Sequence, residues 1–261
     1  KMLGLKNAAF YNKIMKILIP TAKEMNLSLK PHGKYFLSEQ TKTIVASLSQ
    51  YSIEELAKLY HVNLERAEEE HLHLQQLKNE QALTYPALHL FDGLMYRNIK
   101  RSDLMEKELR YIDNHLLITS SLYGIIPAMA LISPHRLDFL VKCTISGKSL
   151  KNYWRNDYDA AISGEEMILS LLSSEFETVF SKSVRDKMLR FKFLEDREGS
   201  LKVHSTISKK ARGQFLTALI ENQITTKEEI KQLQFADFAF REDLSTIDTY
   251  VFVKENKQKT E

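Results

Sequence analysis

The residues that most clearly indicate a binding site are three cations within four positions, Lys209, Lys210 and Arg212. They lie near the start of a predicted amphipathic helix over 205–222, whose apolar residues recur at helical spacing. Acidic side chains usually occupy the first turn of a helix, because the backbone N–H groups there attract negative charge. Cations at the same place add to that attraction. The segment therefore predicts an anion site, suited to the phosphate of a nucleotide or of a nucleic-acid backbone.

Other cations occur at predicted junctions between elements. Lys23 follows an apolar first strand over 15–19, and loops that leave buried strands are common ligand positions in α/β sheets. A solvated loop lysine is the alternative for Lys23. Three cations precede a predicted helix over 102–114, with Ser102 as its N-cap, and Arg136 lies in a long connection. The expected phosphate contacts are Lys23, Arg97, Lys100, Arg101, Arg136, Lys209, Lys210 and Arg212.

A helical hairpin is predicted near the N-terminus. Helices over 52–60 and 63–80 flank a three-residue connection from His61 to Asn63. The spacing resembles a helix-hairpin-helix element, in which a short loop directs backbone N–H groups at a DNA phosphate. Glycine is usual in such loops, and asparagine tolerates the left-handed conformation better than most other residues. His61, Asn63 and Arg66 are therefore candidate accessory phosphate contacts, and a plain helical pair with a solvated acidic face is the alternative.

Three acids accompany the basic segments and indicate a second possible chemistry. Asp92 follows a predicted strand over 85–91, Asp138 is two residues after Arg136, and Glu175 follows an apolar strand. Carboxyl groups beside a bound phosphate are suited to acid–base or metal-assisted chemistry. Internal ion pairs, such as one between Arg136 and Asp138, are the structural alternative.

No metal site and no cofactor are expected from the motifs. His71 and His73 are two positions apart, so they do not share a helix face. The sequence contains neither a P-loop nor a G-x-G-x-x-G fingerprint. Cys143 lies in an apolar run, which is a poor setting for a reactive thiolate.

The predicted elements give a mixed α/β fold, with a central mixed sheet flanked by helices. Apolar runs at 15–19, 116–119 and 167–172 are typical of buried strands, and each precedes a turn with polar or small residues. Alternation in 190–194 and 201–204 indicates a hairpin that leads into the cationic helix. The candidate N-caps of that helix are Ser205 and Ser208.

The domain boundaries follow from the same pattern. We expect one domain over residues 15–254, because no linker or repeat interrupts it. Residues 1–14 are expected to be an extension outside the fold, and 255–261 a polar tail.

Composition limits the class of protein. The 261 residues are 43% hydrophobic, which is enough for a sizeable core, and the net charge of +3 excludes a global basic field. Anion binding must therefore be regional, and between 182 and 213 ten bases outnumber four acids. A single cysteine excludes an internal disulfide, and no stretch approaches the roughly 20 apolar residues of a membrane span. We expect a cytoplasmic protein without a membrane partner.

Six motifs together resemble one known family, the YaaA family of bacterial peroxide stress proteins. They occur in the family's order, and the resemblance covers about residues 15–254. The motifs are Ile19-Pro-Thr-Ala-Lys23, Phe91-Asp-Gly-Leu-Met-Tyr96, Ser121-Leu-Tyr-Gly124, Pro134-His-Arg-Leu-Asp138, Leu171-Leu-Ser-Ser-Glu-Phe176 and Lys209-Lys-Ala-Arg-Gly213. The first loop departs from the family's usual Ser-Pro-Ala-Lys, and His135 and Asp138 replace the usual Tyr and Glu. The cations of these two motifs, Lys23 and Arg136, match the family pattern.

The resemblance implies a fold that is largely the family's own, with a positively charged cleft that binds double-stranded DNA. It also implies protection from hydrogen peroxide and a limit on free intracellular iron. The favoured hypothesis is a DNA-binding stress protein without catalysis and with little sequence specificity. The alternative is an enzyme acting on a nucleotide or another small phosphorylated ligand, with Asp92, Asp138 and Glu175 as its catalytic acids. One enclosed pocket would favour the enzyme, and an open groove as wide as a duplex would favour DNA.

Overall fold

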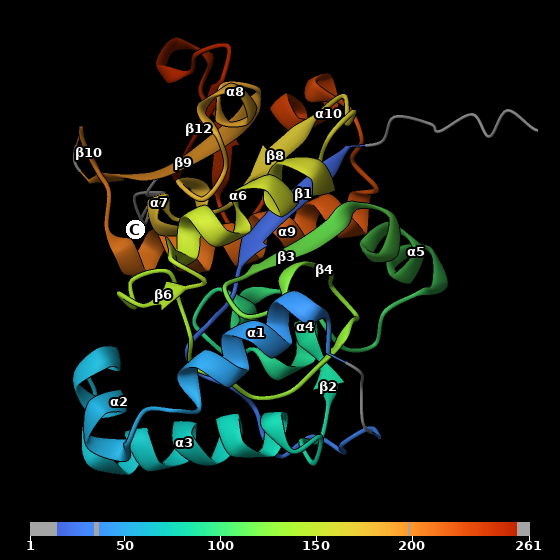
Figure 1. Cartoon of the computed structure of the whole chain (residues 1–261). Helices are drawn as coiled ribbons and strands as arrows, with labels where there is room; N and C mark the ends of the chain where they lie inside the picture. Colours follow the sequence, from blue (N-terminus) through green and yellow to red (C-terminus); the bar gives the residue numbers. More distant parts are fainter. Residues whose placement is uncertain (1–14, 34–36, 198, 255–261) are drawn as a thin grey trace, which may run out of the picture.

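A sheet of eight strands organises the part of the chain that the structure describes, namely residues 15–33, 37–197 and 199–254 of a computed structural model (Figure 1). The strands run in the order β11, β12, β9, β8, β1, β3 and β4, and β10 pairs with β9. The bounds of the sheet strands are β1 Lys16–Pro20, β3 Leu116–Ser120, β4 Gly124–Pro127, β8 Ile168–Ser170, β9 Met188–Arg197, β10 Ser200–Lys202, β11 Phe238–Phe240 and β12 Thr249–Lys254. The expected extension at 1–14 and the tail at 255–261 lie outside the described residues.

The centre of the sheet is parallel. β1 pairs in parallel with β3 on one side and with β8 on the other, and the parallel run continues from β8 through β9 to β12. The strands β4, β10 and β11 are antiparallel to their neighbours. Because carboxyl ends of parallel strands meet at one edge, the loops after β1, β3 and β8 lie on the same side of the sheet.

Helices surround this sheet. The remaining short strands form two small pairs, β2 Tyr85–Pro86 with β5 Leu131–Ile132 and β6 Thr144–Ile145 with β7 Lys148–Ser149. The helices are α1 Glu39–Leu48, α2 Ile53–Tyr60, α3 Leu64–Lys78, α4 Ala87–Leu90, η1 Tyr96–Asn98, α5 Glu106–His115, α6 Leu150–Ala161, α7 Ser174–Glu177, α8 Lys182–Arg185, α9 Ser205–Asn222, α10 Lys227–Gln232 and η2 Glu242–Leu244.

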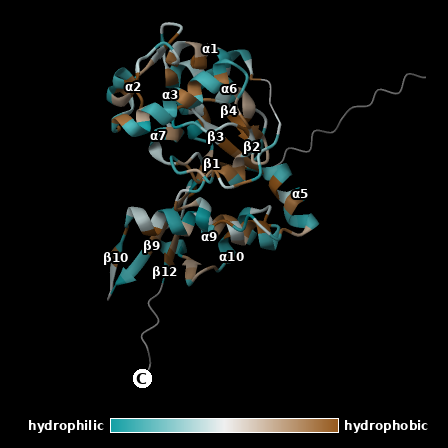
Figure 2. Cartoon of the chain, turned by 90° about the horizontal axis from the view of Figure 1, so that it is seen from below, coloured by the Kyte–Doolittle hydropathy of each residue, from teal (hydrophilic) through white to brown (hydrophobic). Residues whose placement is uncertain are grey.

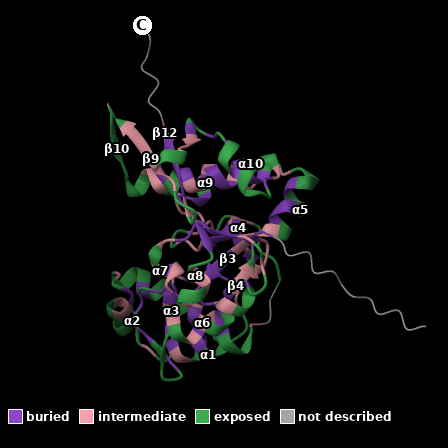
Figure 3. Cartoon of the chain, turned by 90° about the horizontal axis from the view of Figure 1, so that it is seen from above, coloured by how far each residue is buried: buried purple, intermediate pink, exposed green. Residues whose placement is uncertain are grey.

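Two hydrophobic layers separate these helices from the sheet. Ile17 and Ile19 face a layer with residues of α4, α5, α9 and α10, whereas Leu18 faces a layer with residues of α1, α2, α3 and α6. Alternation of side chains along a strand explains this division. The β3–β4 part of the sheet is seen between α9 and α10 on one side and α1, α3 and α6 on the other (Figures 2 and 3). The predicted mixed α/β fold is therefore confirmed.

Two predicted elements differ from the structure in type or in starting residue. The strand predicted over 85–91 is wrong, because only Tyr85–Pro86 is extended and α4 follows directly. A short buried apolar run has no periodicity that distinguishes a strand from a helix. The helix predicted over 102–114 starts at Glu106 instead, where the Glu108 carboxylate accepts the Met105 N–H at 2.8 Å. Ser102 is therefore not its cap.

The cationic helix α9 also begins differently from the prediction. His204 stands at the N-cap position and makes no side-chain capping bond, so neither Ser205 nor Ser208 is the cap. Lys209 and Lys210 are exposed in its second turn. The helix itself, the 190–204 hairpin and the pair α2–α3 match their predicted positions to within a few residues.

Two glycines allow close contacts that bring the basic segments together. A Cβ at Gly213 on α9 would lie 2.3 Å from the carbonyl oxygen of Met95. A Cβ at Gly93 would lie 2.8 Å from the Cβ of Ala22 in the loop after β1. Both separations are too short for real Cβ contacts. Glycine is therefore required at both positions by space, although neither has a positive φ.

We expect Gly213→Ala to destabilise the protein by about 1–3 kcal/mol, through overpacking against Met95. This reverses the gain of roughly 0.5–1 kcal/mol that alanine normally gives over glycine inside a helix. Urea denaturation followed by circular dichroism measures the change. Gly33→Ala is the matched control, because nothing lies within 4 Å of its added Cβ. Equal stability of the two variants would contradict the close contact.

Candidate functional site

A pocket of about 530 Å³ opens beside the loops that follow β1 and β8. Its size falls within the range of roughly 300–1,000 Å³ that is typical of small-molecule sites. Five segments line it: residues 20–24 after β1, 93–97 before and within η1, 136–138, 173–176 around α7, and the α9 positions Thr206, Lys209 and Arg212. The position follows the rule that ligands bind at the carboxyl ends of strands in α/β sheets.

Seven of the predicted site residues meet in this pocket. The cations are Lys23, Arg97, Arg136, Lys209 and Arg212, and the acids are Asp138 and Glu175. Six of them come from four motifs that are far apart in the sequence, and Arg97 directly follows a fifth, so the fold assembles them. Lys210 is exposed on α9 and is not a lining residue.

Lys23 and Asp138 form the shortest ion pair of the pocket. The Lys23 Nζ lies 2.6 Å from Asp138 Oδ2, and the carboxylate is almost completely buried. Asp138 Oδ1 also accepts the backbone N–H groups of Leu140 and Val141 at 2.9 and 3.2 Å. The alternative that Arg136 and Asp138 hold each other is not what the described residues show. Lys23 is held in place by a carboxylate that is itself fixed by the backbone.

Glu175 is the second carboxyl of the pocket. Its Oε1 atom is buried and has no hydrogen-bond partner. Burial raises the pKa of Glu175, and the neighbouring Asp138 carboxylate raises it further. Lys23, Lys151 and the Phe139 backbone N–H act in the opposite direction. The environment therefore favours the protonated acid more than an ordinary glutamate site would.

Arg212 is a half-buried cation without an acidic partner at ion-pair distance among the described residues. Burial lowers the pKa of Arg212, and Glu177 opposes that effect. Glu177 itself accepts from Arg190 Nε at 2.7 Å. An arginine stays charged in proteins even when its pKa falls. Arg212 is therefore a positive charge, partly withdrawn from water, at the wall of the pocket.

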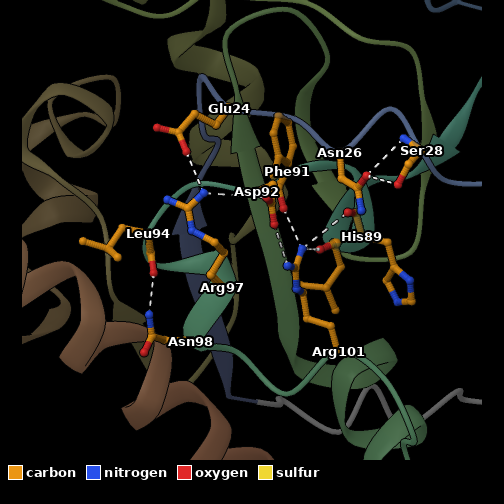
Figure 4. Close-up of polar contacts among 11 residues, drawn as sticks. Glu24, Asn26, Ser28, His89, Phe91, Asp92, Leu94, Arg97, Asn98 and Arg101 are labelled. Atoms are coloured by element: carbon orange, nitrogen blue, oxygen red, sulfur yellow. Dashed lines mark hydrogen bonds and ion pairs between the residues drawn. The ribbon is translucent and has the colours of Figure 1, made fainter.

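Arg97 belongs to a network on the other side of the pocket (Figure 4). Its Nη1 atom lies 2.9 Å from Glu24 Oε2 and 3.7 Å from Asp92 Oδ2. Arg101 donates to the Phe91 carbonyl at 2.7 Å and to Asp92 Oδ1 at 2.9 Å. Asp92 and Arg101 thus brace the 91–97 turn and do not line the pocket.

Lys100 also lies outside the pocket. Its Nζ is 2.8 Å from Glu108 Oε1 and 3.2 Å from Glu221 Oε1, and the Glu108 side chain is fully buried. The two carboxylates raise the pKa of Lys100 by hydrogen bonding and charge, although burial opposes them. The phosphate roles of Lys100 and Arg101 stay predictions, and the structure gives both side chains internal partners.

The hairpin between α2 and α3 uses most of its polar groups internally. His61 adopts the left-handed conformation at φ 54°, and its N–H donates to the carbonyls of Ala57 and Lys58. Asn63 Oδ1 accepts the Arg66 N–H at 3.0 Å, and Arg66 pairs with Glu69 at 2.7 Å. These contacts build the turn. Its role in binding phosphate stays a prediction.

Glu70 is a residue that the sequence analysis did not single out. It is buried on α3, and its Oε2 accepts the Arg136 backbone N–H at 2.7 Å. The Oε1 atom lies 3.2 Å from His73 Nδ1. Its spacing from the buried Ala67 and Leu74 places Glu70 on the apolar face of the helix, which was the available signal. This carboxylate connects the helical hairpin to the pocket loop.

His135 fixes the same loop from the inside. Its Nδ1 lies 3.1 Å from the Ser133 carbonyl oxygen, and its ring packs edge-on against Phe91 and Tyr123. Burial is the main cause of the lowered pKa of His135. A buried imidazole therefore holds this loop from the inside, while Glu70 holds the Arg136 backbone N–H.

The fold and the pocket define an α/β protein with a positively charged site at the carboxyl edge of a mixed sheet. The family model described as "Peroxide stress protein YaaA" matches residues 15–244, and the chain belongs to this family. A role in peroxide stress follows from that membership. No described helix is long and apolar enough to cross a membrane.

Relatives in streptococci cover nearly the same length. A UPF0246 protein of Streptococcus gordonii is 59% identical over 240 residues, covering 92% of this chain and 98% of the relative. A UPF0246 protein of Streptococcus pneumoniae serotype 19F is 57% identical over 241 residues, covering 92% and 100%. The family resemblance read from the motifs is thus confirmed.

We expect Glu70→Ala to destabilise the protein by about 1–3 kcal/mol, because the Arg136 N–H is left without its acceptor. Amide hydrogen exchange at Arg136 should become faster in this variant. Glu68→Ala is the matched control on an exposed position of the same helix, and its effect should stay within about 0.5 kcal/mol. Unchanged exchange at Arg136 in Glu70→Ala would refute the connection.

Proposed function

We propose that this peroxide stress protein acts by binding the phosphate backbone of double-stranded DNA. The observation that carries the proposal is the convergence of five cations, from four segments, on one pocket wall and rim. They outnumber the three carboxyls of the pocket, Glu24, Asp138 and Glu175. Clustered cations on one face are the electrostatic footprint of phosphate binding.

Exposed cations extend this surface beyond the pocket. Lys210 follows Lys209 on α9, and Lys202 is exposed on β10, which leads into the helix. The β9–β10 hairpin projects past the end of the sheet (Figure 1). These cations are not presented together by one helix of the kind that enters a DNA groove and reads bases. Contacts of this kind position DNA without reading its sequence.

DNA binding supports the peroxide role in a direct way, because a covered backbone is less accessible to oxidants generated in solution. We propose that the limit on free iron is an indirect effect of this binding. Among the described residues, no group of three or more His, Cys, Asp or Glu residues is placed to hold a metal.

We expect the salt dependence of duplex binding to fall in Lys209→Ala/Lys210→Ala. Each lost phosphate contact lowers the slope of log K against log salt by about 0.9. Fluorescence anisotropy with a labelled duplex at several salt concentrations measures the slope. Lys107→Ala/Lys227→Ala removes the same charge from exposed positions on α5 and α10, and it should leave the slope unchanged. Equal slopes in all three proteins would remove the α9 cations from the interface.

Peroxide protection should not depend on the single cysteine. Burial raises the pKa of Cys143, so its thiol stays protonated at neutral pH and reacts slowly with peroxide. We expect Cys143→Ser to restore peroxide survival in a deletion strain as well as the wild type does. Loss of protection in this variant, at normal protein level, would show that the thiol takes part.

A second candidate function is an enzyme acting on a nucleotide or phosphorylated small molecule. The observation that favours it is that Asp138 and Glu175 lie inside the pocket, whereas contacts to DNA phosphates need no acids there. Asp92 lies outside the pocket and is committed to Arg101. Duplex binding that is unaffected by blocking the pocket would favour this second function.

A further inference from the structure

The carboxyl group of Glu175 in the pocket is not suited to binding a phosphate. Glu175 is an acid among cations, and its buried Oε1 atom has no hydrogen-bond partner. A buried polar atom without a partner loses its hydrogen bond to water and gains none in return, so such an atom calls for an explanation. A bound molecule that supplies the missing hydrogen bond is such an explanation.

The surroundings of Glu175 decide its protonation state. Asp138 already takes the nearest ammonium, Lys23, at 2.6 Å, so the pocket has one ion-paired carboxylate and one carboxyl without an ion pair among the described residues. Two neighbouring carboxyls disfavour each other's ionisation, so the one without an ion pair is the one that accepts a proton more easily. The direction of the Glu175 pKa agrees with this assignment. A protonated Glu175 donates a hydrogen bond.

The rest of the pocket has a cationic part and an apolar part. Lys209 and Arg212 come from α9, and neither has an acid at ion-pair distance among the described residues. Leu94, Met95 and Phe176 supply apolar surface next to them. A volume of about 530 Å³ is much larger than an inorganic phosphate requires and is typical of a site for a drug-sized molecule.

We propose that the pocket holds one 5′-phosphorylated nucleoside unit. Its phosphate lies against Lys209 and Arg212, and a polar acceptor of its sugar or base receives the hydrogen bond of protonated Glu175. The proposal rests on the proposed function in one respect, namely that the same cations hold phosphate. The unit is either a free nucleotide or a nucleotide of DNA, since both present the same chemistry.

Binding should therefore depend on pH in a defined direction. The charged groups that act on Glu175 are Asp138 in the pocket loop, Lys23 after β1 and Lys151 on α6, with the Phe139 N–H. The ligand needs the protonated acid, so affinity is full below the pKa of Glu175 and falls as the pH rises through it. The phosphate of the ligand titrates near pH 6 as well, so a reference variant is required.

Glu175→Gln is that variant, because the amide is neutral, similar in shape and able to donate at every pH. Calorimetric titration with deoxyadenosine 5′-monophosphate from pH 5.5 to 8.5 gives the affinity of each protein. We expect the ratio of wild-type to Glu175→Gln affinity to fall about tenfold per pH unit above the Glu175 pKa. Glu68→Gln, at an exposed acid of α3 that does not line the pocket, should keep the wild-type profile.

Two results of the nucleotide titrations would overturn the proposal even if the nucleotide binds. One is a constant affinity ratio of wild type to Glu175→Gln across this pH range. The other is equal affinity for the nucleotide and for inorganic phosphate, since the nucleoside would then add nothing. Duplex binding that persists while the nucleotide fails to bind would leave the proposed function intact and remove only this inference.

Competition with duplex identifies the source of the unit. Displacement of the bound nucleotide by unlabelled duplex would support a nucleotide of DNA as the occupant. Simultaneous binding of both would support a free nucleotide. Loss of nucleotide binding in Lys209→Ala/Lys210→Ala is expected for either source, and unchanged nucleotide affinity there would contradict the placement of the phosphate on α9.

Discussion

The candidate site depends on the close contact between α9 and the segment around η1. Gly213 lies so close to Met95 and Asn98 that even one added carbon would overlap them. Arg212 is its neighbour in sequence, so the contact that seats the helix also fixes this guanidinium at the pocket. Gly93 brings the loop after β1 close to the same segment in the same way. Three basic segments thus meet because two positions have no side chain.

The sequence predicted the strands and turns around the site better than the ion pairs within it. The apolar run over 15–19 predicted β1, which spans Lys16–Pro20, and the turns after β1 and β8 line the pocket, whereas the turn after the strand predicted at 116–119 does not. Periodicity and strand composition carry that information locally. Local sequence patterns do not show which distant side chains form ion pairs. The partner of Asp138 is Lys23, which is 115 positions away in the sequence.

The errors in the predicted elements have a related cause. Serine at 102 and at 205 offered plausible caps, but tertiary packing began the helices at other residues. Glu70 belonged to a helix whose acids suggested a solvated face, yet it is buried and holds the Arg136 backbone. A charged residue on an apolar face was the signal, and its acceptor role required knowing what lies opposite.

The acids of the pocket divide its cations into two kinds. Glu24 and Asp92 hold Arg97, and Asp138 holds Lys23, so a phosphate must compete with a carboxylate for each of these two. Lys209 and Arg212 on α9 face no such competitor among the described residues. An incoming anion therefore gains most at α9, whereas the part of the pocket with the ion-paired Asp138 and with Glu175, whose pKa is raised mainly by burial, is better suited to neutral polar groups. An asymmetric pocket of this kind fits a molecule with one charged end and one neutral end better than it fits a uniform row of phosphates. We therefore propose that a duplex contacts the exposed cations of α9 and β10, whereas a single nucleotide unit occupies the pocket.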